Sequence, residues 1–336
     1  MRTKRFRKLF FVILAFSLWT VTVYDYHGLQ AASWPDASIK GIVPWGAGGG
    51  TDRQLRGLVP YLSDELKVPV IVENKPGASG MAAAIDFVKN QPKDGSVFLA
   101  QIQLYLTVGN VVTGEQINIE DLSIIAGISE DILGIHIKKE RWKNLGDFIK
   151  DIQKNPGKFS IGFMPRAAPH VALAVLEKAT GIKGKIIEVP YQSGGKARID
   201  LLGGHIDAEI SGVDSTFAAG GDQLQTLGLF STTPHPRDQK IAMINDELTR
   251  IGIKEKVPDL YNYFFYALHN SVKEKYPDRW NTLVVAFKRA INNPKFIKWF
   301  ETQGWTPTYR GPEEGKKIML ELDKRAREYT DLLKEK

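Results

Sequence analysis

The residues of this chain best suited to chemistry lie in one glycine-rich stretch, Pro44 to Asp52, which reads PWGAGGGTD. Four of the five residues from Gly46 to Gly50 are glycine, so the backbone can adopt conformations that side chains would forbid. A helix should begin near Thr51, with its unpaired N–H groups and positive dipole end at the loop. Such a turn binds anions, and a tight turn without a ligand is the alternative.

Two elements must position this loop. Residues 40 to 43, which end in Ile42 and Val43, predict a short buried strand before it. Thr51 and Asp52 suit the first turn of the following helix, because their oxygens can accept its unpaired N–H groups. Apolar residues then recur at helical spacing and predict its buried face: Leu55, Leu58, Val59, Leu62 and Leu66.

A second unit of the same kind follows. The sequence predicts a strand over residues 68 to 72, a loop rich in proline and glycine over 73 to 80, a helix over 81 to 88 and a third strand over 97 to 101. Alternating strands and helices predict a mostly parallel sheet covered on both faces.

Ser79, in the second loop, is a poor candidate for a nucleophile. The segment Gly77 to Gly80 lacks the spacer of the G-x-S-x-G elbow, so capping or ligand contact is the better role for Ser79. The chain contains no cysteine, which excludes disulfides, thiolate metal sites and a cysteine nucleophile. None of the six histidines shows a metal-binding spacing, and we expect no metal and no cofactor.

A similar layout recurs in the middle of the chain. A strand over residues 159 to 163 leads into the loop 164 to 170, and a helix is predicted over 171 to 180. Arg166 is the one cation in this loop, and its planar guanidinium suits a carboxylate, although a solvent-exposed arginine explains it equally well. His170 is best explained as a cap or packing residue.

The order of the segments predicts two domains. We place a crossing near Glu130 and Asp131, between two apolar runs, and a return linker over 231 to 238. The predicted division is 33 to 132 for the first part of domain 1, 133 to 234 for domain 2, and 235 to 336 for the return to domain 1, with a helical C-terminal third.

The N-terminus predicts export. A basic head, an apolar run and small residues near position 32 are typical of a signal peptide over 1 to 32, with an uncleaved anchor as the alternative. This segment has five basic residues and one acidic residue, net +4, so the +7 of the whole chain becomes 7 − 4 = +3 for the remainder. That small excess gives no reason to expect a nucleic-acid partner.

The motifs around both loops resemble one known family. The residues that carry the resemblance are Ile42 to Asp52, Val72 to Gly80, Asp94-Gly95, Val189 to Tyr191 and Leu202 to Asp207. They look like the tripartite tricarboxylate transporter solute receptors, the TctC or Bug family, and cover nearly the whole mature chain.

The resemblance implies an exported, non-catalytic receptor with a type II-like periplasmic-binding-protein fold, made of two α/β domains with a ligand cleft between them. It implies a monomer that closes on a small carboxylate and delivers it to a membrane permease. The loops of the family, with the glutamines after the third strand, predict these ligand contacts: Trp45, Gly46, Ala47, Gly48, Gly49, Asp52, Ser79, Gln101, Gln103, Arg166, Ala167, His170, Tyr191 and Asp207.

The chain departs from the family pattern in the facing loop. The family usually has a Gly-x-Gly-Ser run before the histidine, whereas this chain has Met164 to Pro169. Its two prolines remove N–H donors and Arg166 adds a charge, so we expect more recognition by charge and less by backbone. Gln101 and Gln103, where small hydroxyl residues are common, point the same way.

A dinucleotide-binding oxidoreductase is the principal alternative. Gly46 and Gly48 follow a strand and Glu73 closes the next one, which imitates the Rossmann fingerprint, but Thr51 occupies the third glycine position. A P-loop is excluded because no lysine follows the glycines. An exported hydrolase is the third possibility, and the sequence nominates neither a nucleophile nor a base for it.

Overall fold

The structure, a computed structural model, describes residues 34 to 333, with the backbone alone at 219 to 221. Residues from Ser38 onward form one compact unit, and everything below concerns that unit. The predicted signal segment, 1 to 32, lies outside the described residues.

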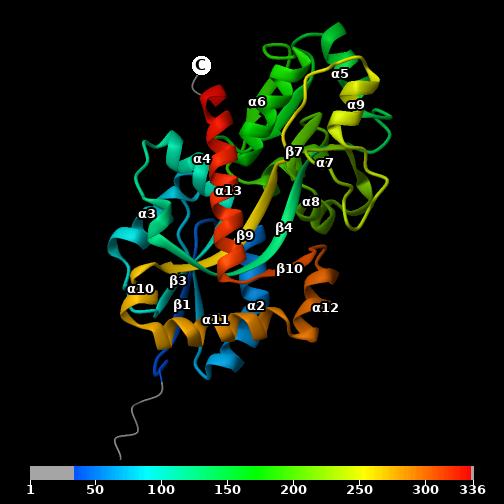
Figure 1. Ribbon diagram of the computed structural model, residues 1–336. Coiled ribbons are helices and arrows are strands. Elements are labelled where there is room, and N and C mark those ends of the chain that lie inside the picture. The colour runs from blue at the N-terminus through cyan, green and yellow to red at the C-terminus, as the bar shows by residue number, and fades with distance from the viewer. Residues whose placement is uncertain (1–33, 334–336) are drawn as a thin grey trace, which may run out of the picture. The chain divides into compact units, whose positions relative to one another are not determined.

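One long strand, β4, connects two parts of the fold. It spans Leu122–Lys138, 17 residues, and its apolar residues are buried along most of its length. From Leu122 to Ile132 it pairs with β9, and from Leu133 to Lys138 it pairs with β7 and β8. We call the strands around the first segment sheet A and those around the second sheet B, and each sheet with its helices forms a lobe. Figure 1 shows β4 and β9 side by side.

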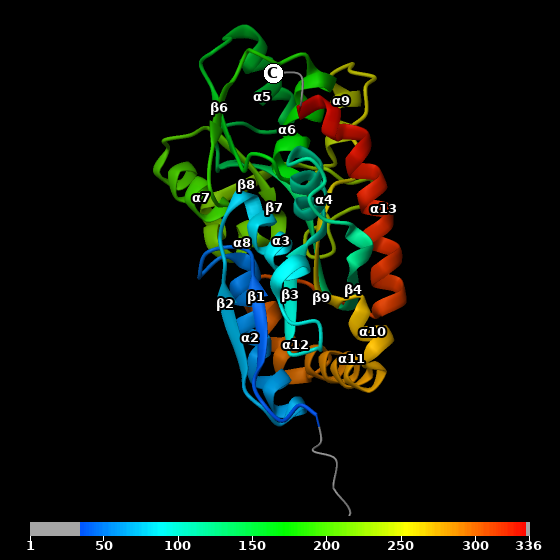
Figure 2. The same ribbon diagram turned by 90° about the vertical axis from the view of Figure 1, so that its left-hand side faces the viewer.

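Sheet A belongs to the first lobe. Its strands, besides β4, are β1 (Ile39–Val43), β2 (Val70–Asn74), β3 (Val97–Ile102), β9 (Tyr261–His269) and β10 (Pro307–Arg310). The order β2-β1-β3-β9-β4 can be followed across Figure 2 for the first four strands. The outer pairs are parallel, but β9 is antiparallel to both β3 and β4.

Sheet B belongs to the second lobe. Its strands, besides β4, are β5 (Ser160–Phe163), β6 (Ile187–Pro190), β7 (Ala208–Gly212) and β8 (Leu224–Leu229). Strand β5 pairs in parallel with β6 and β7, whereas β7 and β8 are antiparallel to β4. Both sheets therefore combine parallel pairs with antiparallel ones, and the edge strands β8 and β10 are antiparallel to β4, which makes the fold mixed α/β rather than mostly parallel.

Helices flank the sheets and cover their apolar side chains. Those of the first lobe are α2 (Gly50–Leu66), α3 (Met81–Asn90), α4 (Gln103–Val112), α10 (Ser271–Lys275), α11 (Pro277–Ile291), α12 (Pro294–Thr302) and α13 (Pro312–Thr330). Those of the second lobe are α5 (Leu145–Lys154), α6 (Ala168–Thr180), α7 (Gly194–Gly203), α8 (Val213–Gly220) and α9 (Ile244–Arg250). Helix α13 packs along β4 and α4, and it also contacts α6 of the second lobe (Figure 1).

The structure differs from the sequence expectation in the last third of the chain. That third is not entirely helical, because β9 and β10 both belong to sheet A. Segment 231 to 238 does not lead directly back to sheet A: the chain first forms α9, which packs against α5 and β8, and reaches sheet A at β9. Within residues 34 to 333, no helix combines the length and the apolar character that crossing a membrane requires.

Candidate ligand site between the lobes

The glycine loop is held in shape by Asp52, in the first turn of α2. Asp52 is 2% exposed, and its Oδ2 accepts a hydrogen bond from the Gly48 N–H at 2.8 Å. Asn74 donates to its Oδ1 at 2.9 Å and to the Trp45 carbonyl at 2.9 Å, and Arg56 donates to both oxygens. Burial alone would raise the pKa of Asp52, but these hydrogen bonds outweigh it and lower the pKa. The carboxylate is therefore ionised, and its hydrogen bonds stabilise the conformation of the loop.

The loop leaves room where its glycines lie. A Cβ atom added to Gly46 or Gly48 would meet no heavy atom within 4 Å. Gly48 has φ +82°, a conformation that side chains disfavour. Gly49 precedes α2 and has no side chain that could accept a hydrogen bond. No side-chain cap therefore occupies the N–H groups of the first turn of α2. Ala47 is exposed in the same turn.

A second loop of the first lobe supports the first. Ala78 and Ser79 have positive φ values of 46° and 52°, and Gly80 packs close to the Trp45 ring. Trp45 in turn makes an edge contact with Tyr105 of α4, their ring centroids 5.8 Å apart. The indole Nε1 of Trp45 is buried and has no hydrogen-bond partner within the described part of the chain. A buried donor without an acceptor is costly, so this atom marks a position that a ligand oxygen would satisfy.

The facing loop of the second lobe meets this region directly. The Ser79 hydroxyl donates to the Pro165 carbonyl at 3.0 Å, which joins the two lobes. Arg166 has φ +56° and is exposed, and its N–H donates to His170 Nδ1 at 3.3 Å. The His170 ring stacks on Phe163, whereas Ala167 is fully buried before α6. The structure thus brings Ser79 of the second loop against Pro165 of the facing loop, with the Arg166 side chain at the surface.

Helix α8 supplies another wall, which the sequence analysis did not identify. A Cβ on Gly50, at the start of α2, would lie 3.9 Å from Ser215 Oγ in the first turn of α8. Asp131 of β4 caps that turn: it accepts from the N–H groups of Asp214 and Ser215 and from the Ser215 hydroxyl. Burial and the neighbouring Asp214 raise the pKa of Asp131 to about 6.

A buried ion pair lies beside this wall. Arg198 of α7 is 6% exposed and Glu209 of β7 is 0% exposed, with Nη2 and Oε1 3.4 Å apart. Burial raises the pKa of Glu209 to about 6, despite the Arg198 charge and the Ser211 hydroxyl. Burial, followed by the charges of Asp131 and Glu209, raises the pKa of Tyr105, so its phenol stays a neutral donor.

Three predicted ligand contacts, Gln101, Gln103 and Tyr191, form hydrogen bonds with other residues of the chain. Gln101 accepts from the Ile102 N–H at 2.8 Å, and Gln103 donates to Thr107, which bonds Asp323 of α13. The Tyr191 hydroxyl donates to Asp200 at 2.6 Å. Their roles in ligand contact stay predictions.

Asp207 lies at the far edge of sheet B. It directly precedes β7, and its Oδ2 accepts from the N–H and hydroxyl of Ser160 at the start of β5, while Arg141 forms an ion pair with it. The facing loop follows the end of β5. Because β5 and β7 are parallel, the structure does not bring Asp207 to the edge where the loops meet.

Sequence reasoning missed Tyr105, Asp131, Arg198, Glu209 and Ser215. Two of them left a detectable signal, because Asp131 and Glu209 are acidic residues inside apolar runs that form buried strands. A charge is rarely placed in such a run without a partner or a function.

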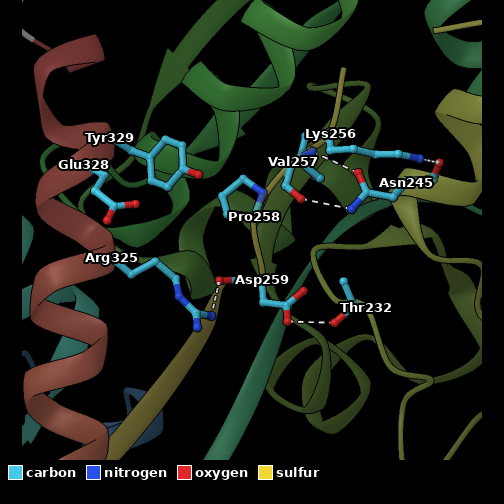
Figure 3. A pocket seen from close by; sticks show the side chains of 9 residues that line it. All are labelled: Thr232, Asn245, Lys256, Val257, Pro258, Asp259, Arg325, Glu328 and Tyr329. Atoms are coloured by element: carbon cyan, nitrogen blue, oxygen red, sulfur yellow. Dashed lines mark hydrogen bonds between the residues drawn. The ribbon is translucent and has the colours of Figure 1, made fainter. Parts of the chain in front are cut away.

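The cavities described in the structure lie away from this site. One, of about 570 Å³, lies between α13 and segment 256 to 259 (Figure 3). Its polar groups largely satisfy one another: Asn245 pairs with the Val257 backbone, and Thr232 donates to Asp259. Among the described residues, no group of histidine, cysteine, aspartate and glutamate side chains is arranged to hold a metal ion.

Several curated proteins are similar in sequence. A Cupriavidus necator protein of the UPF0065 group is 30% identical over 53% of this chain and 54% of its own length, so that match spans about half of the relative. The Bordetella pertussis protein BugT is 27% identical over 85% of this chain and 86% of its own length.

Solved structures share the fold. A TctC solute-binding protein from Polaromonas is 24% identical with a TM-score of 0.66, covering 90% of this chain and 100% of that one. The R. palustris protein Rpa4515, solved with adipate, is 16% identical with a TM-score of 0.75, covering 89% and 98%. The fold is that of the two-domain periplasmic binding proteins.

The dinucleotide-binding alternative finds no support in these comparisons. The Glu73 carboxylate, its required ribose ligand, is paired with Lys40 at 2.7 Å and Lys75 at 3.4 Å. The model of the tripartite tricarboxylate transporter family receptor, TctC, matches residues 55 to 332. This chain therefore belongs to the TctC family of tripartite tricarboxylate transporter receptors.

Proposed function

We propose that this protein is an extracytoplasmic receptor that captures a small carboxylate between its lobes and delivers it to a membrane permease. The observation that carries the proposal is the Ser79–Pro165 hydrogen bond, which joins the two loops across the lobes at 3.0 Å. It places the facing loop against the second loop of the first lobe, and Gly80 of that loop packs on Trp45, beside the open glycine turn and the start of α2. Backbone N–H groups at a helix start can bind a carboxylate, and this binding requires no catalytic group.

The relatives support the same function. The similar R. palustris protein was solved with adipate, a dicarboxylate, and the family model names a transporter receptor. The N-terminal segment, with its basic head and apolar run, supports export to the periplasm. We propose that the protein binds as a monomer and is not an enzyme.

Binding would draw the lobes together. Ligand contacts shared between the glycine loop and the facing loop favour the closed arrangement, because only that arrangement satisfies both sets of groups. Strand β4 and strand β9 form the connection about which this closure occurs.

Thermal unfolding with candidate ligands tests the function. A ligand that binds only the folded state raises the melting temperature. We expect saturable stabilisation by at least one member of a panel of mono-, di- and tricarboxylates and aromatic acids, and none by NAD. Stabilisation by NAD with none by any carboxylate would overturn the proposal.

A further inference from the structure

Helix α8 of the second lobe is bonded to the first lobe through its own first turn. Asp214, the second residue of α8, is 1% exposed, and its Oδ2 accepts a hydrogen bond from the Thr306 N–H at 2.9 Å. Thr306 directly precedes β10, which pairs with β4 in sheet A. One buried carboxylate therefore joins elements that belong to different lobes.

The other oxygen of Asp214 faces two side chains of segment 231 to 238, which follows β8 in the second lobe. His235 Nε2 lies 3.2 Å from Asp214 Oδ1, and Arg237 Nη1 lies 3.9 Å from it. His235 Nδ1 accepts from the Arg237 N–H at 3.3 Å, so the proton of a neutral imidazole lies on Nε2, facing the carboxylate. Arg237 Nη1 also donates to the Gly304 carbonyl, which gives this segment its own bond to the first lobe.

The two lobes also pack tightly at this place. A Cβ on Gly304 would lie only 2.9 Å from the Cα and the Cβ of Ala218 on α8, and Gly304 has φ +90°, so a larger residue does not fit. The next residue, Trp305, is 1% exposed, and the Arg53 guanidinium of α2 lies over its ring, 4.9 Å from the centroid. Segment 303 to 306 is therefore packed firmly into the first lobe where it meets α8.

Asp131 attaches the same turn of α8 to the connecting strand β4. It accepts from the Asp214 N–H at 2.9 Å and from the Ser215 hydroxyl at 2.7 Å. The register shifts of β4 against β9 precede Asp131 in the chain. Bending of β4 at these shifts would keep the bonds of Asp131 to α8 and lengthen the bond between Asp214 and Thr306.

We propose that Asp214 and Arg237 form a latch that holds the two lobes together before any ligand binds. The latch consists of two hydrogen bonds, from the Thr306 N–H to Asp214 and from Arg237 to the Gly304 carbonyl. The proposal goes beyond the receptor function, because it concerns the closed molecules that exist without a ligand. A larger closed fraction before binding strengthens the apparent affinity for every ligand by the same factor, whatever the chemistry of the ligand.

Distances between labels on the two lobes test the latch without a ligand. The chain has no cysteine, so Ile71→Cys on β2 and Ile199→Cys on α7 create two unique sites for spin labels. These residues are 52% and 69% exposed, and β2 and α7 lie on the side of the molecule opposite α13 (Figure 2). Pulsed electron paramagnetic resonance then gives the distribution of distances between the labels.

Asp214→Ala should increase the mean distance by more than about 2 Å, the size at which a domain rearrangement exceeds side-chain adjustment. Arg237→Ala should shift the mean in the same direction by less, because the bond between Asp214 and Thr306 remains. The Arg237 side chain is 39% exposed, so this variant should fold, and it decides the question if Asp214→Ala does not fold. Unchanged distances in the variants whose melting curves show a folded protein would overturn the latch.

Asp151→Ala is the matched control. Asp151 also accepts a hydrogen bond from a largely buried donor, Trp142 Nε1 at 2.8 Å, but both residues belong to the second lobe. This variant should leave the distances between the labels unchanged. An equal shift in Asp151→Ala and Asp214→Ala would show a general loosening of the fold and would count against the latch.

The outcomes separate the latch from the receptor function. For each carboxylate that stabilises the natural protein, Asp214→Ala should weaken the affinity by the factor by which the closed fraction falls in the distance distribution. A shift of the distances with no carboxylate bound by either protein would support the latch and remove the receptor function. Binding of a carboxylate with no shift of the distances would do the reverse.

Discussion

The glycine loop of the first lobe and the Arg198–Glu209 pair of the second use their charges in opposite ways. In the glycine loop, both oxygens of Asp52 accept hydrogen bonds from Gly48, Asn74 and Arg56, so the carboxylate stabilises the shape of the loop. In the second lobe, Arg198 and Glu209 each keep one buried atom without a partner among the described residues, and the Arg166 side chain is exposed.

This difference distinguishes residues that hold the ligand from residues that choose among ligands. The glycine loop, whose one buried carboxylate is fully paired, presents the same backbone donors and the same Trp45 Nε1 to every carboxylate. A wall with unpaired buried charges discriminates, because a ligand that lacks the matching group leaves them unsatisfied. We infer that affinity for the carboxylate head resides in the first lobe and that the choice among ligands resides in the second.

Asp52→Ala should break the comparison most strongly. It leaves the Gly48 N–H without its acceptor, removes one of the two acceptors of the Asn74 amide and unpairs Arg56, and we expect a loss of about 2 to 3 kcal/mol in the free energy of unfolding. Urea denaturation measures this loss. Asp64→Ala, at an exposed position of the same helix, is the control and should change little; a similar loss there would show that the effect is not local to the loop.

Glu209→Gln should sharpen the comparison through pH. The pKa of Glu209 is about 6 in the folded protein, above its ordinary value of 4.5, so its contribution to stability is present below pH 4.5 and is lost as pH rises through 6. The variant lacks this loss. Its free energy of unfolding should therefore gain on that of the natural protein by on the order of 1 to 2 kcal/mol between pH 4.5 and 7.5.

Melting temperatures across that pH range, taken without ligand, measure the Glu209 effect. A constant difference between the two proteins would mean that Glu209 titrates at its ordinary pKa and that its burial costs little.

Gly48→Ala tests whether the first loop depends on backbone conformation. Gly48 has φ +82°, where an L side chain is strained by about 1 kcal/mol, and the added Cβ meets no other atom within 4 Å. We expect this loss in the free energy of unfolding, measured by urea denaturation. Gly46→Ala, also in open space but without a positive φ, should leave the free energy of unfolding unchanged. An equal loss there would show that the positive φ of Gly48 is not the cause of the destabilisation.

Arg166→Ala should have the smallest effect. The side chain is exposed, so its removal should change the free energy of unfolding by less than about 0.5 kcal/mol. A screened charge contributes at most about 1 kcal/mol to the binding of a carboxylate. Calorimetry with the best ligand decides the role: a much larger loss of affinity would place Arg166 among the residues that select the ligand.

The sequence predicted the glycine loop well because local chemistry determines it. The run from Gly46 to Gly50, followed by Leu55 and Leu58, has few solutions other than a turn and a helix start, and α2 begins at Gly50. The role of Asp52 was less accessible. Its position in the first turn suggested a cap, but its partners include Asn74, which the sequence places on another strand.

The second wall could not be predicted in the same way. Arg198 and Glu209 are 11 residues apart, and only the packing of α7 on β7 brings them together. Strand β9 was missed for a related reason: YNYFFYALH is mostly aromatic and aliphatic, and a short apolar run does not distinguish a central strand from a buried helix. The family resemblance supplied the two-lobe fold, which these patterns alone do not determine.

Strand β4 restricts the motions that are open to the two lobes. Since it pairs along its length with β9 and then with β7 and β8, neither lobe can slide along it: a slip of one residue would turn Leu133 and Ile135 away from the core. What remains is bending, and the register shifts between Ile124 and Ala126 and between Gly127 and Ser129 provide places for it. The two lobes can therefore move relative to each other only by bending of β4, and this shared strand sets both the axis of the motion and its limit.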